Sequence, residues 1–313
     1  MKQFNFDIVG KKKLFTGISV ACVAIILALT FILGVKVDIT FSGGAIFTYS
    51  YEGDLDTAEV KTISEKILNS GVNIQESVNS LTNEPNIQIS LIEAGAVDAD
   101  VQAELSDTLK EKFADNNIAM VNVSNVDPTI GGEFFTKCMV AIGFAFILML
   151  LYIAFRFRKI GGWSAGVFAI LSLMQDAMLV FGTFVIFRIP LDNNFVAAIL
   201  TILGYSINST IVLFDRVREN KSLGLRITVG ELVNKSINET LARTMASSFT
   251  TIIAMVIVCI VALIFGINSI ISFAFPLVVG LFAGTYSSTF LSGPLWVAWQ
   301  EHKLNKLKAK KKA

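Results

Sequence analysis

The sequence predicts a helical membrane protein with six transmembrane spans and one α+β domain inserted after the first span. Hydrophobic residues make up 53% of the 313 residues and charged residues only 16%, whereas soluble domains average about half apolar and a quarter charged. The apolar residues gather in stretches with almost no charge, and a bilayer crossing needs about 20 such residues. The polar segment 36–133 interrupts these stretches and is long enough for a small domain.

The apolar stretches place six spans in order. Each carries at most one charged residue, and they cover residues 14–35, 138–155, 160–187, 193–214, 244–276 and the continuation to 300. Because 244–300 is too long for one span, the turn-forming residues Gly266 to Ser269 are expected to divide it. The first span has full length and no small-residue cleavage site follows it, so it is expected to remain as an anchor.

Lysine and arginine gather at one end of the predicted spans. Short cytoplasmic loops collect these residues in membrane proteins. They occur in segments 11–13, 156–159, 216–226 and 303–312, all on the same side. The sequence therefore predicts a multi-pass protein with both termini in the cytoplasm. Trp163, Trp296 and Trp299 are expected in the interfacial belt on that side.

The charge is divided between the two sides. Segment 36–133 holds 17 acidic and 5 basic residues, although the whole chain has a net charge of +1. The basic tail 301–313 is explained by topology and by attraction to anionic membrane lipid, at about 1 kcal/mol per residue near the surface. A ribosome or nucleic-acid site is the alternative, but no aromatic or motif context supports it, so no nucleic-acid partner is predicted.

Segment 36–133 alternates between strand and helix patterns. Strands are expected at 45–51, 72–78, 86–92 and 119–123. Asp56 is expected to cap a helix with Val60 and Ile63 on one face, and Leu105 and Leu109 mark a second helix. The order strand, helix, strand, strand, helix, strand is the βαββαβ arrangement of ferredoxin-like domains.

The junction before this domain contains Asp38, Gly43 and Gly44. The glycines would let the chain turn from the membrane into the first strand, and Asp38 would cap the turn. The predicted division of the chain is therefore an N-terminus with the first span, an extracytoplasmic domain, the remaining spans with an amphipathic cytoplasmic segment, and a basic tail. These parts cover residues 1–35, 36–133, 134–300 with the amphipathic segment at 215–240, and 301–313.

Small and polar residues mark the fourth span and the charged residues that follow it. Segment 204–220 reads GYSINSTIVLFDRVREN. It resembles the fourth span of the SecF family, accessory subunits of the bacterial Sec protein translocase, whose pattern is close to GYSINDT followed by VVFDRIREN. The matching residues include Gly204, Tyr205, Asn208, Thr210, Asp215 and Arg216.

The resemblance extends over most of the chain. Similar stretches lie at 7–13, 43–44, 152–157, 239–244 and 284–288. It implies the resistance-nodulation-division class, a bacterial cytoplasmic membrane, and a role in the proton-motive-force-dependent late steps of protein export. It also implies several partners: a SecD-like subunit, the SecY, SecE and SecG channel, a YidC-type insertase and the translocating polypeptide. Whether the outer domain contacts that polypeptide or is a folded spacer stays open.

Asp176 is the only acidic residue deep inside a predicted span. Placing a carboxylate there costs at least about 2.5 to 3.5 kcal/mol, so an intramembrane acid is a candidate for function. Taking up and releasing a proton at Asp176 would couple a proton gradient to movement. A static hydrogen bond to a serine or threonine of a neighbouring helix is the alternative.

Two departures from the family pattern affect the proton path. In the family, the residue matching Arg243 is thought to work with a fourth-span aspartate, but Ser209 stands at that aspartate position, and Gln175 precedes Asp176 where histidine is usual. A hydroxyl relays a hydrogen bond but holds no negative charge at neutral pH. Three explanations follow. Asp176 has taken over the proton-coupling role of the missing aspartate, or the coupling acid lies in a SecD-like partner, or the chain is a non-conducting assembly factor. A stand-alone proton-driven exporter is a further alternative.

Small residues recur at every fourth position in the last span. They are Gly280, Gly284, Ser288 and Ser292, and this spacing lets helices approach closely. The face would pack inside the bundle or against a partner. Between the fourth and fifth spans, segment 215–240 mixes apolar and charged residues, which predicts an amphipathic helix at the cytoplasmic interface.

Catalytic motifs are absent from the sequence. It contains no GxxxxGK[ST] phosphate loop, no HExxH motif and no paired-cysteine site. The only histidine, His302, lies in the basic tail, so a serine and histidine pair is not expected. The sequence predicts a protein that is not an enzyme and that has no cofactor or metal.

Overall fold

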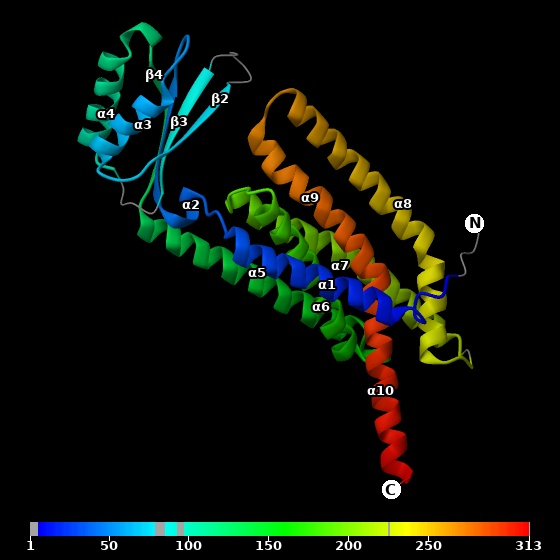
Figure 1. Cartoon of the computed structure of the whole chain (residues 1–313). Coiled ribbons are helices and arrows are strands. Elements are labelled where there is room, and N and C mark those ends of the chain that lie inside the picture. Colours follow the sequence, from blue (N-terminus) through cyan, green and yellow to red (C-terminus); the bar gives the residue numbers. More distant parts are fainter. Residues whose placement is uncertain (1–5, 79–84, 93–96, 225, 313) are drawn as a thin grey trace.

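The computed structural model describes residues 6–78, 85–92, 97–224 and 226–312. A helical bundle forms most of the molecule, and a small sheet with two helices stands beyond one end of it (Figure 1). Within the described residues, six helices are long and apolar enough to cross a membrane. The predicted multi-pass helical architecture with six spans is therefore confirmed.

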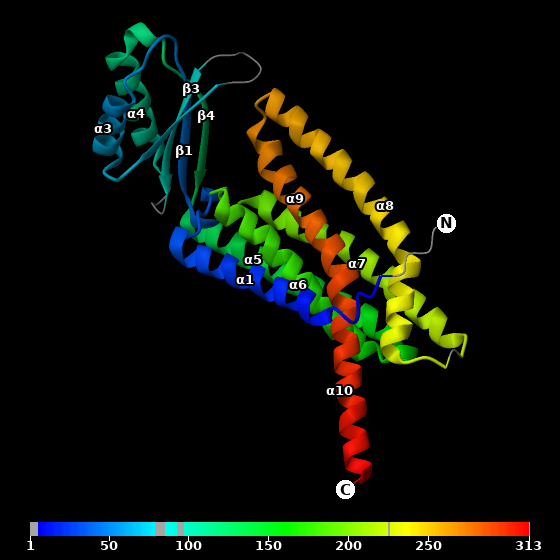
Figure 2. The same ribbon diagram turned by 45° about the vertical axis from the view of Figure 1, so that its right-hand side comes forward.

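The first span is separated from the second by residues 34–127, and the last five spans follow one another with short connections. The six spans are α1 Lys12–Leu33, α5 Pro128–Arg156, α6 Gly162–Ile186, α7 Asn193–Ser222, α8 Val229–Ile264 and a last span composed of α9 Asn268–Tyr286, the π-helix η3 Ser287–Ser292 and α10 Gly293–Lys312. The expected division near Gly266 is confirmed, because α8 ends at Ile264 and Gly266 has φ +64°. Figure 2 shows α8 and α9 as a slanted hairpin whose tip reaches toward the sheet.

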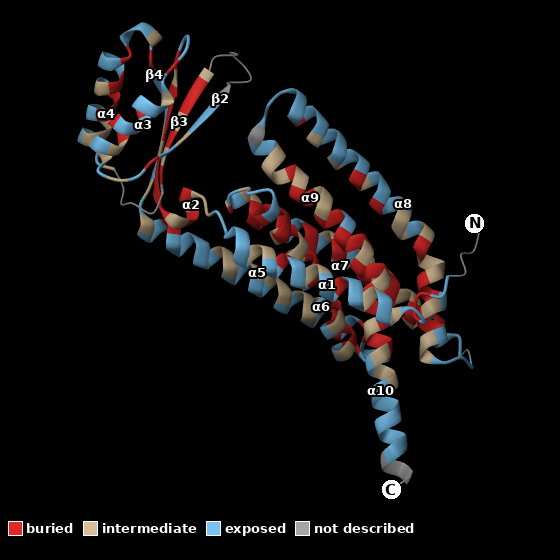
Figure 3. Ribbon diagram, viewed as in Figure 1, coloured by how far each residue is buried: buried red, intermediate tan, exposed pale blue. Residues whose placement is uncertain are grey.

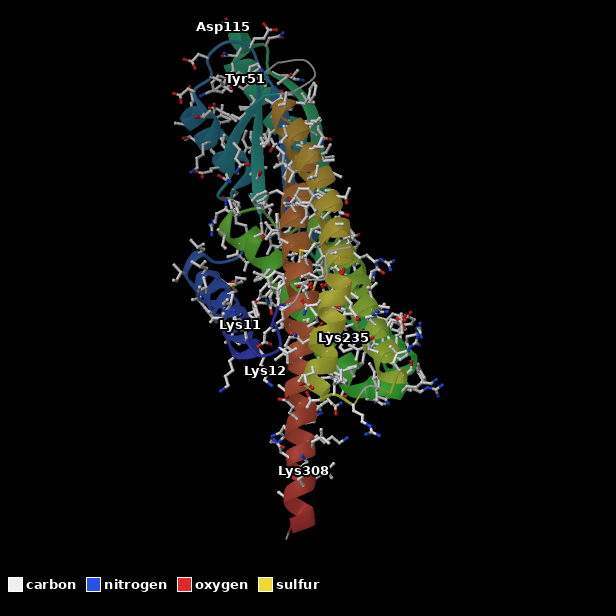
Figure 4. All side chains as sticks on the ribbon, turned by 90° about the vertical axis from the view of Figure 1, so that its right-hand side faces the viewer. Lys11, Lys12, Tyr51, Asp115, Lys235 and Lys308 are labelled. Atoms are coloured by element: carbon white, nitrogen blue, oxygen red, sulfur yellow. The ribbon has the colours of Figure 1, made fainter. Side chains whose placement is uncertain are left out.

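The centre of the bundle is formed by α6 and α7, whereas α8 and the tail of α10 are largely exposed (Figure 3). One apolar cluster, near the sheet, includes Val180, Phe184 and Ile202. Another lies at the opposite end and includes Phe157 and Phe214. Lys11, Lys12 and Lys235 lie at that opposite end, away from Tyr51 and Asp115 (Figure 4). We call it the basic end of the bundle.

Trp296, predicted for the interfacial belt, is buried inside the bundle. Its side chain is only 3% exposed, its ring packs edge-on against Phe214 with centroids 5.9 Å apart, and its indole N–H donates to Ser164 Oγ at 3.0 Å. Trp163 and Trp299 are 63% and 48% exposed. Trp296 is instead a core residue, because α6 and α7 cover it.

The elements beyond the bundle follow the predicted order of strands and helices. They are β1 Gly44–Ser50, α3 Thr57–Leu68, β2 Asn73–Val78, β3 Pro85–Ile92, α4 Ala99–Lys112, the short η1 Ala114–Asn116 and β4 Ala119–Val126. The strands form one antiparallel sheet in the order β2-β3-β1-β4. Strand alternation buries Phe47 and Tyr49 of β1 and Ile89 of β3 in the cluster that also contains Leu105 of α4.

The junction between bundle and sheet is tightly built. Asp38 caps the single-turn helix α2 Ile39–Ser42 by accepting a hydrogen bond from the Thr40 N–H at 2.9 Å. Gly43 and Gly44 have φ values of +78° and +132°, which glycine adopts at little cost. The predicted turn is confirmed, although α2 itself was not expected.

The connection between α7 and α8 differs from the prediction. Segment 215–240 is not a separate amphipathic helix: α7 continues to Ser222 and α8 begins at Val229. A capping box between Thr228 and Glu231 starts α8. The mixed apolar and charged pattern arises because two ends of long helices pack together at the basic end.

Candidate functional site

Asp176 lies in the middle of α6 and its side chain is fully buried. The Ser206 hydroxyl of α7 donates a hydrogen bond to Asp176 Oδ2 at 2.6 Å, and the Ser287 hydroxyl of η3 donates to the same oxygen at 2.8 Å. The acid therefore connects three helices at the centre of the bundle. Within the described residues, no group of three His, Cys, Asp or Glu side chains is placed to hold a metal ion.

The two oxygens of Asp176 have different surroundings. Both serines bind Oδ2, and in the part of the chain that the structure describes Oδ1 has no hydrogen-bond partner. A buried polar atom left in this state costs free energy, about 1 to 3 kcal/mol. The arrangement holds the side chain by one oxygen and leaves the other available to carry or release a proton.

The partner helix changes its winding at this site. Ser287 is the first residue of η3, a π-helical segment in which Ser288, Thr289 and Ser292 are also buried. Single π-turns inside α-helices are rare and occur frequently at functional sites. The hydrogen bond from Ser287 therefore attaches Asp176 to the one wide turn of the last span.

Ser209 makes no described hydrogen bond with Asp176 and lines a small cavity between α7, α8 and η3. The cavity has a volume of about 10 Å³. It is lined by five hydroxyl-bearing residues, Ser209, Thr240, Thr244, Ser288 and Thr289, and by the apolar residues Leu213, Ile237 and Leu241. This size is close to the lower limit for one buried water. The position where the family has aspartate therefore borders a small cavity of mixed polar and apolar lining.

Arg243 is exposed on α8 and makes no ion pair with any described residue. The structure therefore does not bring Arg243 and Asp176 together. The described hydrogen-bond partners of the Asp176 side chain are the hydroxyls of Ser206 and Ser287. Tyr205 donates to Ser248 of α8 at 3.3 Å, a contact between the fourth and fifth spans.

The charged residues after the fourth span join helices at the basic end. Asp215 pairs with Arg156 of α5 at 3.1 Å and with Arg218 at 2.6 Å. Arg216 pairs through Nε with Glu239 of α8 at 2.7 Å. Asn220 also donates to Glu239, at 2.6 Å. These contacts fix the ends of α5, α7 and α8 relative to one another.

The chain matches the family model of the protein export membrane proteins SecD and SecF, C-terminal part, over residues 105–302. This is well over half of its length. The chain belongs to the SecD/SecF family.

Individual relatives extend the match to nearly the whole chain. The SecF subunit of Calditerrivibrio nitroreducens is 35% identical over 93% of this chain and 93% of its own, and that of Petrotoga mobilis is 29% identical over 97% and 99%. The SecDF subunit of Bacillus subtilis is 34% identical over 96% of this chain, which spans only 39% of that longer protein. The crystal structure of SecDF from Thermus thermophilus, described as a translocon-associated membrane protein, superimposes with a TM-score of 0.77 at 29% identity, over 95% of this chain and 39% of that one.

The small residues of the SecD/SecF chain fall on two kinds of surface. A Cβ added to Gly280 would lie 2.6 Å from Ile202 Cγ1, and one on Gly284 would lie 3.0 Å from the Cβ of Ser206. Ser288 is buried next to them, so this face packs inside the bundle. Gly204 and Asn208 are exposed on α7, and a Cβ on Gly204 would meet no described atom within 4 Å. Thr210 is buried, and its hydroxyl has no partner among described residues.

Some residues of the site were not identified from the SecD/SecF sequence pattern. Ser287 was not selected, because serines are common in membrane helices and its contact lies 111 residues away from Asp176. Asn234 and Asn238 bind the backbone of the N-terminal segment. Their spacing of four residues was the available signal, since it places both on one face of α8.

Proposed function

We propose that this chain is an accessory subunit of the Sec protein translocase, which promotes the proton-motive-force-dependent late steps of protein export across the bacterial cytoplasmic membrane. The observation that carries the proposal is the match to SecF subunits over more than nine tenths of both chains. A non-enzymatic role fits the relatives, which are named as translocase subunits.

A SecD-like chain is the first partner that we propose. SecDF relatives hold this region within a chain more than twice as long, so a second half is present beside it in those proteins. The exposed small and polar face of α7 at Gly204 and Asn208 suits close contact with such a partner. SecY, SecE, SecG, a YidC-type insertase and the translocating polypeptide are proposed as further partners.

The orientation belongs to the same proposal. Basic residues at the end opposite the sheet support placing both termini in the cytoplasm (Figure 4). Segment 36–133 would then be an extracytoplasmic domain. Its strand order β2-β3-β1-β4, together with helices α3 and α4 over one face, supports the ferredoxin-like class.

Coupling to the gradient is assigned to Asp176. It is a fully buried acid with one free oxygen, and it is attached to α7 and to the π-helical turn of the last span. Uptake of a proton would weaken its attraction for the two serine hydroxyls, because a charged acceptor makes hydrogen bonds about twice as strong. The three helices would then be free to shift relative to one another.

The export function is tested by pulse-chase in cells depleted of this chain. We expect slow maturation of a secreted precursor and recovery when the wild-type chain is supplied from a plasmid. Unchanged maturation in depleted cells would contradict a role in export. Co-purification with the SecD-like chain separates the proposal from a self-contained exporter, which would assemble without one.

Two glycine substitutions separate partner contact from internal packing. Gly204→Leu is expected to leave the thermal unfolding of the purified chain unchanged and to reduce co-purification of the SecD-like chain at least several-fold. Gly280→Leu is expected to lower stability by about 1 to 3 kcal/mol, because its side chain would overlap Ile202 and Val180. Destabilisation by Gly204→Leu, or unchanged partner recovery, would contradict this assignment.

Ser209→Asp tests whether the family's aspartate position still relays protons. In vesicles that contain the chain and its SecD-like partner, we expect the substitution to increase gradient-driven proton flux, because a titratable group would enter the small cavity between α7, α8 and η3. Ser209→Asn is the control of similar size that does not titrate. Equal flux for the two variants would exclude a relay at this position.

The second candidate function is a non-conducting assembly factor of the translocase. The serine at position 209 and the lack of a described ion pair for Arg243 favour it. This candidate predicts that export depends on the chain but that its contribution does not change when the gradient is dissipated.

A further inference from the structure

An apolar groove opens at the basic end of the bundle, between the start of the chain and α8. Its volume is about 630 Å³, within the range of pockets that enclose small ligands. The apolar side chains that line it are Phe6, Ile8, Phe15, Leu241, Ala242, Met245 and Phe290. The groove therefore borders three elements that are far apart in sequence: residues 6–15, α8 and η3.

One wall of the groove is fixed by hydrogen bonds. Residues 6–10, which we call the arm, lie along α8. The N–H groups of Ile8 and Val9 donate to Asn234 Oδ1 at 2.9 and 3.2 Å, and the N–H of Phe6 donates to Asn238 Oδ1 at 2.8 Å. Ile8 and Val9 are buried. The groove is therefore a built feature of the folded chain.

Two charged side chains line the groove, the cation Lys11 and the anion Asp7. Lys11 lines the groove, is exposed, and forms no ion pair with any residue in the described ranges. Asp7 also lines it, but its Oδ1 accepts the Gly10 N–H at 2.8 Å and so serves the turn of the arm. Lys12 pairs with Glu301 of α10 at 2.5 Å. A free ammonium group thus stands beside the opening.

Charge and apolar surface are arranged in the order of a lipid molecule. Lys11 precedes α1, whereas Phe15 lies one turn inside this first span and Met245 lies in the apolar part of α8. A phosphate headgroup at the level of Lys11 would place an acyl chain along Phe15 and Met245. A zwitterionic headgroup carries its own ammonium group and gains less from Lys11. Basic pockets between membrane helices on the cytoplasmic side bind anionic headgroups in this way.

We propose that this groove binds an anionic phospholipid, with its phosphate at Lys11 and an acyl chain between the arm, α8 and η3. The site is separate from the Asp176 region and does not depend on the export function. A bound lipid would connect the first span to α8 beyond the contacts that the arm makes.

The test uses the full chain in nanodiscs with equal amounts of phosphatidylglycerol and phosphatidylethanolamine. Native mass spectrometry then counts the lipid molecules that stay bound to the protein after it is released from the nanodisc. We expect phosphatidylglycerol to be retained preferentially. Lys11→Gln is expected to lower this preference about fivefold, the factor that corresponds to ~1 kcal/mol per basic residue. Lys306→Gln, the same change at an exposed position on α10, is the control and should leave it unchanged.

A second pair of variants tests the acyl-chain part. Ala242→Phe is expected to fill the groove and abolish retention, whereas Ala246→Phe, an exposed position on the same helix that does not line the groove, should not. Equal retention of both lipids, or full retention in Ala242→Phe, would overturn the proposal. Loss of preference in Lys13→Gln but not in Lys11→Gln would also overturn it, since Lys13 lines a different groove, between α1 and α10.

Discussion

Replacing Asp176 by asparagine is expected to abolish the gradient-dependent part of protein export while the chain still folds. The amide oxygen of asparagine can accept the hydrogen bonds from Ser206 and Ser287 that the carboxylate accepts now. It cannot take up or release a proton. Export into inverted membrane vesicles is measured with and without an ionophore that dissipates the proton gradient. The variant should export at the same rate in both conditions, and this rate should equal that of the wild type with the ionophore.

The controls for Asp176 distinguish coupling from a structural role. Asp115→Asn makes the same change at an exposed position beyond the bundle and should keep the full response to the gradient. Asp176→Leu removes the acceptor of two buried hydroxyls and is expected to lower stability by about 1 to 3 kcal/mol. If Asp176→Asn kept its gradient response, the acid would be only a static hydrogen-bond acceptor.

Gly44→Ala is expected to disrupt the attachment of the sheet to the bundle. Gly44 has φ +132°, a conformation that costs other residues of order 1 to 3 kcal/mol. A Cβ there would also overlap the carbonyl oxygen of Leu91, the residue beside its strand partner Ile92. Overpacking adds about 1 to 3 kcal/mol. Hydrogen exchange of the β1 and β3 amides in the full chain should accelerate strongly.

Gly53→Ala is the matched control for this prediction. Gly53 also has a positive φ, +77°, but a Cβ there would approach Asn116 only to 3.6 Å. Gly53→Ala should therefore lose only the free energy that comes from the positive φ, and it should accelerate amide hydrogen exchange less than Gly44→Ala. Equal acceleration in the two variants would show that the close approach to Leu91 contributes nothing.

The elements that sequence analysis predicted correctly are those with a local signal. The alternation around Ile87 and Ile89 marked β3, and Asp56 marked the start of α3, where it accepts from the Ala58 N–H at 2.9 Å. The uncharged stretches marked the spans, because their length and composition are set by the bilayer itself. Each of these signals lies within about twenty residues of chain.

The predictions that were wrong or incomplete concerned contacts between distant segments. Trp296 has the composition signal of a belt residue, but its burial depends on how α6 and α7 pack. Segment 215–240 has an amphipathic pattern, and no local feature shows that α7 and α8 continue into it. Asp176 was selected as a buried acid, whereas its link to Ser287 depends on the position of the last span. Periodicity carries no information about such pairings.

The arm also sets an order for biogenesis. Its binding residues, Asn234 and Asn238, follow it by 225 to 232 residues. Synthesis at about 5 to 20 residues per second places roughly 10 to 50 seconds between them. During this interval the first span has been synthesised, but the arm that precedes it has no docking site. The arm can bind only after α8, the fifth span, has been synthesised. Arm binding therefore marks a late stage in the assembly of the bundle.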